Sequence, residues 1–428
     1  MARSRNARRK KHTYTTEQEP TPTENSMLSL DDVTTQIMGA FEPVTSNNRS
    51  PTLLENPRVV CADITEPGIP CFLYLSPTPG QADMVIIDYL LSVMWTIREA
   101  PTALQQPIPG HERELYFRIG EVPGGKGLGM VATRAIKAGE LIHAERPVVI
   151  SRPELYTTSS LSPVGDKEYY DMALSGLSPQ ALESFLALHN AFPNEGPIDP
   201  MSGILNTNSF DTSLKIGDGD DNLEKLAGCY PTLSRANHDC SPSANFHFSQ
   251  KTFCGQFFAT RDILEGEEIT VTYTDYLMSH KERNRVLKKT YGFICTCRTC
   301  SLPPALVKES DMRRRDIDTM LKDAAEDTLR YPQPTELELR QLVRWAEQEG
   351  LWMTRGMILY HGSLILSVTD CLNVGFEWLK ETRKVFRMLL GEDSLKLEHV
   401  DSLGRKMAQK LASNGVLCHW PTTALEGG

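Results

Sequence analysis

Arg235-Ala236-Asn237-His238-Asp239-Cys240-Ser241-Pro242 is the stretch that decides how this chain folds, and two later segments complete it. One is Gly266-Glu267-Glu268-Ile269-Thr270-Val271-Thr272-Tyr273, and the other is Cys295-Thr296-Cys297-Arg298-Thr299-Cys300. The last segment supplies three thiolates, whereas a closed structural zinc site takes four ligands in a tetrahedron. Cys240 is the obvious fourth ligand. The sequence therefore predicts that one metal ion joins the polar Asn-His pair to the late cysteines.

A zinc ion on Cys240, Cys295, Cys297 and Cys300 would have no open position, so it would be structural and not catalytic. A disulfide and free thiols are the alternatives. The chain has ten cysteines, and its N-terminus lacks the apolar segment of a secretory signal, which together indicate a reducing compartment. In that setting the C-x-C-x-x-C spacing favours zinc.

Length and composition are typical of a globular protein of two or more domains. The chain has 428 residues, of which 40% are apolar and 23% charged, and both fractions are ordinary for folded proteins. The nearest approach to a membrane span, Met84 to Ile97, is too short and contains Asp88. We therefore expect no membrane association and a location in the nucleus or the cytoplasm.

Charge is unevenly distributed along the chain. Residues 1–16 carry six basic side chains and no acid, so the net charge of -10 becomes -16 for the remainder. An acidic body is a poor non-specific nucleic-acid binder but attracts basic peptides, and no sequence-specific nucleic-acid binding is expected. Residues 1–50 are predicted to be a disordered basic tail. Its basic cluster fits a nuclear-import signal, a nucleic-acid contact or a plain solvated tail.

Residues 51–110 are predicted to form an N-terminal extension to which no chemistry can be assigned. Two short apolar runs, at residues 59–61 and 71–75, are predicted strands separated by a Pro-Gly turn. Residues 82–99 are apolar on almost every side, which predicts a largely buried helix.

A glycine cluster at residues 124–130 follows a predicted strand at Leu115–Ile119. Phosphate-binding loops need a helix directly after the glycines, but here Met130–Thr133 and Leu141–Ala144 predict strand, turn and strand. A short internal repeat supports this assignment, because Ala132–Glu140 and Ala259–Glu267 share one pattern of residues. Both copies are predicted to be strand ends joined by tight glycine turns.

Helical patterns occupy two other regions. In residues 151–228, Ser178 followed by Pro179 predicts a helix start, with the helix running to about residue 191. After Cys300, apolar periodicity predicts helices near residues 309–330, 335–349, 352–371, 374–390 and 394–413.

In their order and spacing, these motifs resemble the SET-domain protein lysine methyltransferases, particularly the SET-MYND type and fungal SET proteins that lack the MYND finger. No cysteine lies between Cys71 and Cys229, so the finger is absent. The resemblance implies an α+β chain. A β-rich SET domain of several small sheets would span residues 111–300, with a helical insert at 151–228 and post-SET cysteines at 291–300. A tetratricopeptide-like all-α domain would follow at 301–428.

The resemblance also implies a S-adenosylmethionine-dependent transfer of methyl to a lysine ε-amine of a histone or another protein. That amine must be neutral to attack, and a narrow apolar channel lowers its pKa by desolvation. By resemblance, Phe210 and Tyr273 would line the channel, and the Tyr273 hydroxyl would orient the amine. The implied cofactor site comprises Lys126, Gly127, Leu128, Gly129, Asn237, His238, Tyr291 and Phe293. Protein partners could bind the helical domain.

Three alternatives stay open. Tyr273 could be an ordinary strand tyrosine, and Asn237-His238 an ordinary polar turn. The family motif usually continues Cys-x-Pro-Asn, whereas Ser243 follows Pro242 here, and a hydroxyl replaces only some amide contacts. A SET scaffold that binds partners without useful turnover is therefore the rival hypothesis. Methylation of a small molecule is the third. Glu267 and Glu268 are adjacent on a predicted strand and should point to opposite faces, so they are not expected to work together as an acid–base pair.

Overall fold

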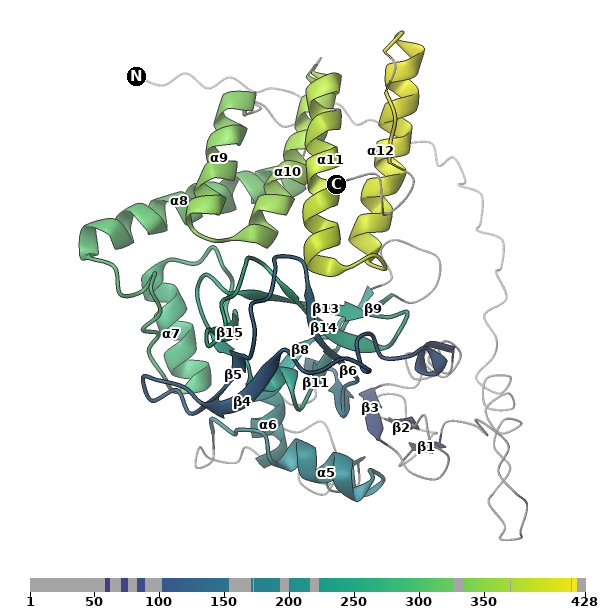
Figure 1. Ribbon diagram of the computed structural model, residues 1–428, viewed down its shortest axis with the longest axis vertical. Helices are drawn as coiled ribbons and strands as arrows, with labels where there is room; N and C mark the ends of the chain where they lie inside the picture. Colours follow the sequence, from purple (N-terminus) through teal and green to yellow (C-terminus); the bar gives the residue numbers. More distant parts are fainter. Residues whose placement is uncertain are drawn as a thin grey trace, which may run out of the picture. The chain divides into compact units, whose positions relative to one another are not determined.

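Short strands in small separate sheets make up the region that holds the three motifs (Figure 1). The computed structural model describes residues 58–61, 71–75, 83–88, 102–153, 171, 173–192, 200–215, 223–326, 334–369, 371–416 and 418–421. All of them belong to one compact unit, Thr52–Gly428. The predicted tail, residues 1–50, lies outside the described residues.

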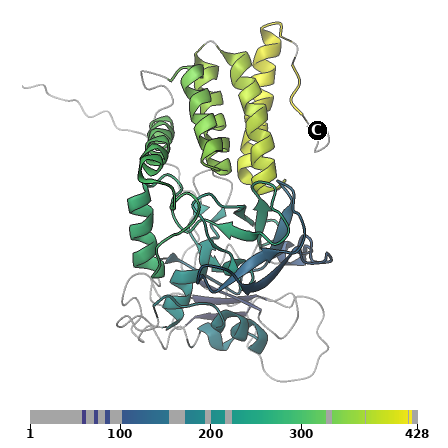
Figure 2. The ribbon, with the colours of Figure 1, turned by 60° about the vertical axis from the view of Figure 1, so that its left-hand side comes forward.

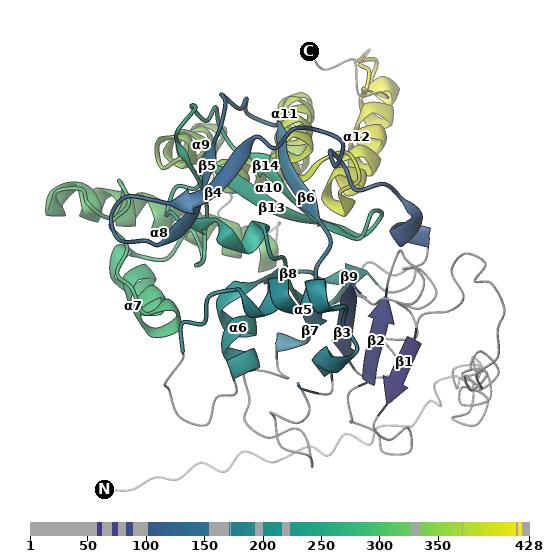
Figure 3. The ribbon, with the colours of Figure 1, turned by 60° about the horizontal axis from the view of Figure 1, so that its bottom comes forward.

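The largest sheet in the described chain has the strand order β1-β2-β3-β7-β11-β8. Its strands are β1 (Arg58–Cys61), β2 (Cys71–Leu75), β3 (Met84–Asp88), β7 (Val149–Ser151), β8 (Ser209–Asp211) and β11 (Ala227–Cys229). β1 and β2 confirm the two strands predicted in the N-terminal extension. Figure 3 shows β1, β2 and β3 side by side.

The prediction of a helix over residues 82–99 is wrong for the first part of this range, because Met84–Asp88 forms β3. This strand pairs antiparallel with β2 and parallel with β7, and Val85, Ile86 and Ile87 are fully buried. A short apolar run fits a buried helix and a buried strand equally well by periodicity. The partner strands and the β-branched side chains decide the outcome here. Residues 89–99 lie outside the described residues.

A second sheet, of order β12-β15-β5-β4, brings two of the motifs together. Its strands are β4 (Phe117–Glu121), β5 (Leu128–Ala132), β12 (Asn237–His238) and β15 (Glu268–Val271). β12 and β15 run parallel, with Asn237 opposite Thr270 and His238 opposite Val271. This register fixes the Asn-His pair beside the strand that leads to Tyr273.

The two copies of the internal repeat bridge to each other. Ile136 and Ile263 exchange both backbone hydrogen bonds, at 2.9 and 2.8 Å, and both side chains are fully buried. Each copy turns at a glycine in the left-handed region, Gly139 at φ 83° and Gly266 at φ 81°. The remaining sheets contain β6 (Leu141–Glu145), β13 (Ala244–Ser249) and β14 (Cys254–Ala259), and the pair β9 (Leu214–Lys215) and β10 (Leu223–Glu224).

The insert contributes α5 (Pro179–Leu186) and α6 (Pro200–Asn208), which lie near β7 and β8 in Figure 3. The predicted helix start is confirmed, because the Ser178 hydroxyl caps α5 by accepting a hydrogen bond from the Ala181 N–H at 3.2 Å. The helix ends at Leu186, earlier than predicted. The loop that follows, Ala187 to Asn190, reaches the cavity that the Asn-His pair also lines.

The C-terminal helices stand side by side over the sheets, as Figure 2 shows. They are α8 (Pro304–Glu326), α9 (Glu336–Gln348), α10 (Trp352–Val368), α11 (Leu372–Leu390) and α12 (Leu395–Ser413), and α7 (His280–Tyr291) precedes them. Each of the five predicted helices is confirmed, and α11 packs on β13 and β14. The predicted α+β class is thus confirmed. Among the described residues, no helix has both the length and the apolar character of a membrane span.

A buried ion-pair cluster joins α8 to the end of α9 and to the first motif. Glu349 binds Arg313 at 2.7 Å and Arg314 at 2.9 Å. Arg314 is fully buried, and its guanidinium also donates to the backbone oxygens of Cys240 and Tyr276. The C-terminal helices are therefore fastened directly to the first motif, at Cys240.

Glu349→Gln should destabilise the chain by about 3–5 kcal/mol, because it leaves buried guanidinium groups without their counter-charge. Glu347→Gln is the matched control, since Glu347 pairs with Arg355 at a half-exposed position and such pairs contribute about 1 kcal/mol or less. Urea unfolding of both variants measures the difference. Equal shifts of the two midpoints would contradict the role given to Glu349.

Candidate functional site

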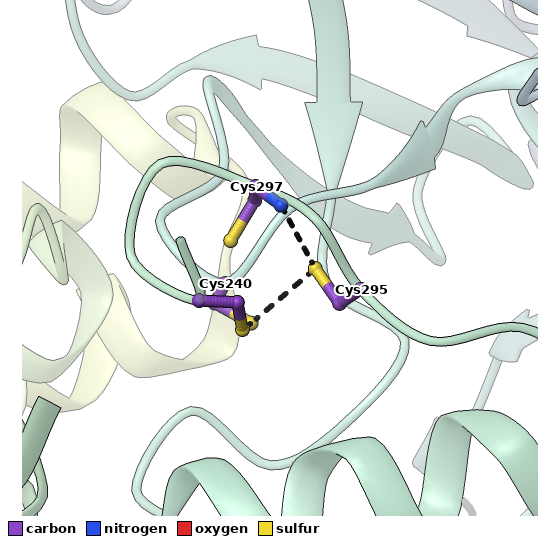
Figure 4. A group of neighbouring side chains, drawn as sticks. Cys240, Cys295 and Cys297 are labelled. Atoms are coloured by element: carbon purple, nitrogen blue, oxygen red, sulfur yellow. Dashed lines mark hydrogen bonds between the residues drawn. The ribbon is translucent and has the colours of Figure 1, made fainter. Parts of the chain in front are cut away.

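The four predicted zinc ligands come together in the folded chain. The Sγ atoms of Cys240, Cys295, Cys297 and Cys300 all lie within 4.8 Å of one another. Figure 4 shows Cys240, Cys295 and Cys297 converging on one point from two separate segments. The Cys240 sulfur lies 4.0 Å from that of Cys295 and 3.5 Å from that of Cys300. Tetrahedral ligands with Zn–S bonds of about 2.3 Å would place their sulfurs about 3.8 Å apart, so the cluster has the size of a zinc site.

The surroundings of the cluster favour thiolates. Arg283, on α7, is 1% exposed and interacts with Cys240 and Cys300. Its Nε is a buried donor without a hydrogen-bond partner among the described residues. A buried cation beside sulfurs is stabilised when those sulfurs are anionic, and four neighbouring thiolates need a metal ion to hold them. None of the four cysteines forms a disulfide in this structure.

A cavity of about 1070 Å³ beside α11 is larger than the one at the motifs, but none of the predicted site residues lines it. The predicted residues instead line a second cavity of about 710 Å³. That volume lies in the usual range for small-molecule sites. Its walls include the predicted Lys126, Gly127, Leu128, Asn237, His238, Tyr273, Tyr291, Phe293, Cys295 and Cys297.

The glycine loop, residues 124–128, forms one wall of this cavity and is hydrogen-bonded to Asn237 of the Asn-His pair. The Asn237 amide donates to the Leu128 backbone oxygen at 3.2 Å and to the Glu268 carboxylate at 2.9 Å. Glu268 also binds Lys126 at 2.7 Å. Gly127 has φ 73°, and a Cβ there would meet nothing within 4 Å, so the backbone is open to a ligand. Gly129 does not line the cavity, and a Cβ there would lie 2.8 Å from the Asn237 amide.

His238 links the cysteine cluster to Tyr273. Its ring is 4% exposed, and burial lowers its pKa from 6.5 to about 4. Nδ1 accepts a hydrogen bond from the Tyr273 backbone N–H at 3.0 Å, and Nε2 lies 3.3 Å from the Cys240 sulfur. Both ring nitrogens are thereby engaged by protein atoms.

Tyr273 is half-buried at the junction of the cavity and an aromatic cluster. Its hydroxyl donates to the Ala236 backbone oxygen at 2.7 Å. Its ring centroid lies 4.8 Å from that of Tyr291 and 6.5 Å from that of Phe293. Burial raises the pKa of Tyr273 well above 10, so the phenol stays protonated. It can therefore orient a neighbouring group as a dipole but is a poor proton acceptor.

Phe210 and Ser243, which the sequence analysis singled out, do not line this cavity. Phe210 stacks on Phe246 with centroids 4.5 Å apart, and the described residues that line the cavity include Tyr273 but not Phe210. Ser243 is fully buried. Its hydroxyl accepts from the Thr270 N–H at 3.0 Å and does not line the cavity, so it fastens the first motif to β15. The role of Phe210 in a substrate channel stays a prediction.

Several residues of the site carry roles that the sequence did not predict. Arg235 lines the cavity and is held by a hydrogen bond to the Ala187 backbone oxygen at 2.8 Å. Glu268 clamps the glycine loop, while its neighbour Glu267 binds Arg261, so the two carboxylates have separate roles. Asn208 and His189 come from the insert. Arg235 and Glu268 both lie inside the quoted motifs, but only the folded chain reveals their partners.

Glu145 holds the turn that leads into the first motif. Its carboxylate accepts from the N–H groups of Thr232 and Leu233 at 2.8 and 2.5 Å, at the start of η1 (Leu233–Arg235). Burial raises its pKa from 4.5 to about 7. The folded state therefore binds more protons than the unfolded state between these values, and stability falls as pH rises through this window.

Glu145→Gln should abolish this part of the pH dependence, because the amide oxygen still accepts hydrogen bonds but does not titrate. The unfolding free energy of the wild type, relative to this variant, should decrease from pH 4.5 to about 7 and then level off. Denaturant unfolding at several pH values measures this difference. Parallel curves for both proteins would show that Glu145 titrates normally.

The sequence is similar to known proteins over its central region. Residues 127–274 match the family model described as "SET domain". The chain is 29% identical over 243 residues to "Histone-lysine N-methyltransferase set5" of Schizosaccharomyces pombe, covering 56% of this chain and 68% of that protein.

Two human proteins are also similar. "Histone-lysine N-methyltransferase SMYD1" is 28% identical over 189 residues, covering 41% of this chain and 34% of that protein. "N-lysine methyltransferase SMYD2" is 27% identical over 214 residues, with 49% and 46% covered. The matches thus span less than half of either human relative. Residues 127–274 thus match a SET domain, and around this region the chain is similar to relatives named as lysine methyltransferases of the SMYD kind.

Proposed function

We propose that this chain is a S-adenosylmethionine-dependent protein-lysine N-methyltransferase. One observation carries the proposal: Tyr273 lines the same cavity as the glycine loop, the Asn-His pair and Phe293. The relatives named as lysine methyltransferases support it.

The cavity fits S-adenosylmethionine in its chemistry. Lys126, Arg235 and Asn237 supply polar groups for the amino-acid part of the cofactor, and the open backbone at Gly127 allows close approach. Tyr291, Phe293 and Ile294 supply an apolar surface suited to the adenine. When bound, the cofactor would supply an electrophilic methyl on a sulfonium sulfur.

The chain's own residues would align the acceptor and exclude water. A lysine amine that reaches this cavity would have to be neutral to accept the methyl, and the ammonium formed by the transfer would release a proton to solvent. The aromatic rings around Tyr273 lower the local polarity, which favours the neutral amine. The Tyr273 hydroxyl would orient the amine and methyl in line.

The four cysteines would hold one structural zinc ion. The separation of their sulfurs and the buried Arg283 beside them support this assignment. Zinc would keep Phe293 and Tyr291 against the Asn-His pair, because the cysteines follow these aromatic residues directly in the chain. The metal would thus complete the cofactor cavity without taking part in the chemistry.

A histone or another lysine-bearing protein is the proposed acceptor, and the nucleus or cytoplasm the proposed location. The acidic remainder of the chain, at -16 outside residues 1–16, suits a basic protein substrate. The helical array is a candidate surface for protein partners. Ser243, one ground for the scaffold alternative, bonds the backbone of β15 and does not line the cavity.

The test is incubation of the full chain with methyl-labelled cofactor and either histones or cell lysate. Transfer of label to protein, recovered as methyl-lysine after hydrolysis, is the expected result. Cofactor binding without transfer to any protein would favour a SET scaffold without turnover. Label in a small-molecule fraction would favour methylation of a small molecule.

A further inference from the structure

We propose that His238 is a positioning residue that couples the cysteine cluster to Tyr273, and that it acts through these two partners more than through the cofactor. The inference rests on the proposed function for its kinetic consequence. Its structural part stands on the hydrogen bonds around the ring.

The tautomer of His238 follows from its partners. The Tyr273 backbone N–H can only donate, so Nδ1, which lies 3.0 Å away, must accept and carries no proton. The proton of the neutral ring is then on Nε2. An imidazolium would leave the Tyr273 N–H facing another donor.

The position of this proton also determines the role of the Cys240 sulfur. With its proton on Nε2, the ring donates to the Cys240 Sγ at 3.3 Å, so this sulfur must accept, as a metal-bound thiolate does. Histidines and other donors next to metal ligands orient those ligands and tune their basicity. His238 therefore stabilises Cys240 in the form that zinc requires.

A continuous connection results. It runs from the Cys240 sulfur through the His238 ring to the Tyr273 backbone, and the Tyr273 hydroxyl returns to the Ala236 oxygen at 2.7 Å. Ala236 immediately precedes the Asn-His pair, so both ends of the tyrosine are held by one short segment. Loss of the metal or of the ring should allow Tyr273 to shift, and displacements of about 1 Å cost methyl transfer about 10²-fold.

Two substitutions separate the contact of His238 with the Cys240 sulfur from its contact with the Tyr273 N–H. His238→Asn keeps an amide oxygen near the position of Nδ1 but does not reach the sulfur. His238→Gln places an amide nitrogen near the position of Nε2 but loses the acceptor for the Tyr273 N–H. His399→Asn and His399→Gln are matched controls, since the exposed His399 contacts Tyr360 in the helical array.

The readouts are zinc loss to a chromogenic chelator, kcat, and the Kd for the cofactor. In His238→Asn we expect zinc loss to be faster by about tenfold or more, with a smaller fall in kcat than in His238→Gln. In His238→Gln we expect kcat to fall by about 10–100-fold, with slower zinc loss than in His238→Asn. The controls should change none of the three quantities.

A second measurement needs no His238 variant and no turnover. Fluorotyrosine placed at position 273 of the full chain should change its ¹⁹F shift when a chelator removes zinc, whereas the same label at position 360 should not. An unchanged signal at 273, or a rise in cofactor Kd that is equal in both His238 variants without altered zinc loss, would overturn the proposal. Absence of methyl transfer by the wild type would instead count against the proposed function, because the zinc and ¹⁹F measurements do not depend on it.

Discussion

Tyr273→Phe should lower kcat by about 10²–10³-fold, the usual effect of removing one oriented polar group from a catalytic site. The hydroxyl is held by the Ala236 backbone oxygen at 2.7 Å, and the variant removes it without changing the ring that packs on Tyr291. Cofactor binding should change little, because the ring still fills its place in the wall. Initial rates with labelled cofactor, together with calorimetric titration, separate the two quantities.

Tyr230→Phe is the matched control. Tyr230 is fully buried, and its hydroxyl bonds that of Thr212 at 2.8 Å away from the cavity. Loss of that bond should cost about 1 kcal/mol of stability and leave kcat within a few-fold of the wild type. A Tyr273→Phe variant as active as Tyr230→Phe would remove Tyr273 from the mechanism.

Cys300→Ser should disturb the structure more than the loss of any one hydrogen bond in the site. Structural zinc contributes on the order of 10 kcal/mol to the folding of small zinc-binding domains, and three thiolates hold the metal far less tightly than four. The segment that carries Tyr291 and Phe293 should then leave the cavity wall. We expect zinc content well below one per chain and cofactor affinity weakened by at least about tenfold.

The control for this variant is Cys371→Ser, at a half-buried cysteine beside α11 and outside the cluster. It should keep its zinc and its affinity for the cofactor. Elemental analysis and calorimetry of both variants provide the measurement. Full zinc content in Cys300→Ser, or normal cofactor affinity after zinc removal, would show that the cluster does not support the cavity.

The local sequence pattern was sufficient to predict the C-terminal helices and the grouping of the four cysteines. The C-x-C-x-x-C spacing leaves one tetrahedral position open, and Cys240 fills that place in the cluster. Helix starts such as Ser178-Pro179 are specified within a few residues. The C-terminal helices were predictable from apolar periodicity within each segment, most clearly α9 and α11, whose apolar side chains lie on one face.

Features that depend on distant partners were not predictable. Met84–Asp88 is a strand because β2 and β7 pair with it, and nothing inside the segment identifies those partners. Ser243 looked like a defect in a cofactor motif, yet its hydroxyl bonds the backbone of β15. The clamp of Glu268 on Lys126 and Asn237 joins three separate segments. Such contacts exist only once the parallel register of β12 and β15 is formed.

The most direct test of the proposed cofactor and zinc sites is a crystal structure of the full chain with S-adenosylhomocysteine, recorded at the zinc absorption edge. We predict that the ligand occupies the cavity between the glycine loop, Asn237 and Phe293, with its sulfur toward Tyr273, and that one zinc peak lies among the four cysteine sulfurs. Ligand density beside α11 instead would contradict the cofactor assignment, and four sulfurs without a metal peak would contradict the zinc assignment.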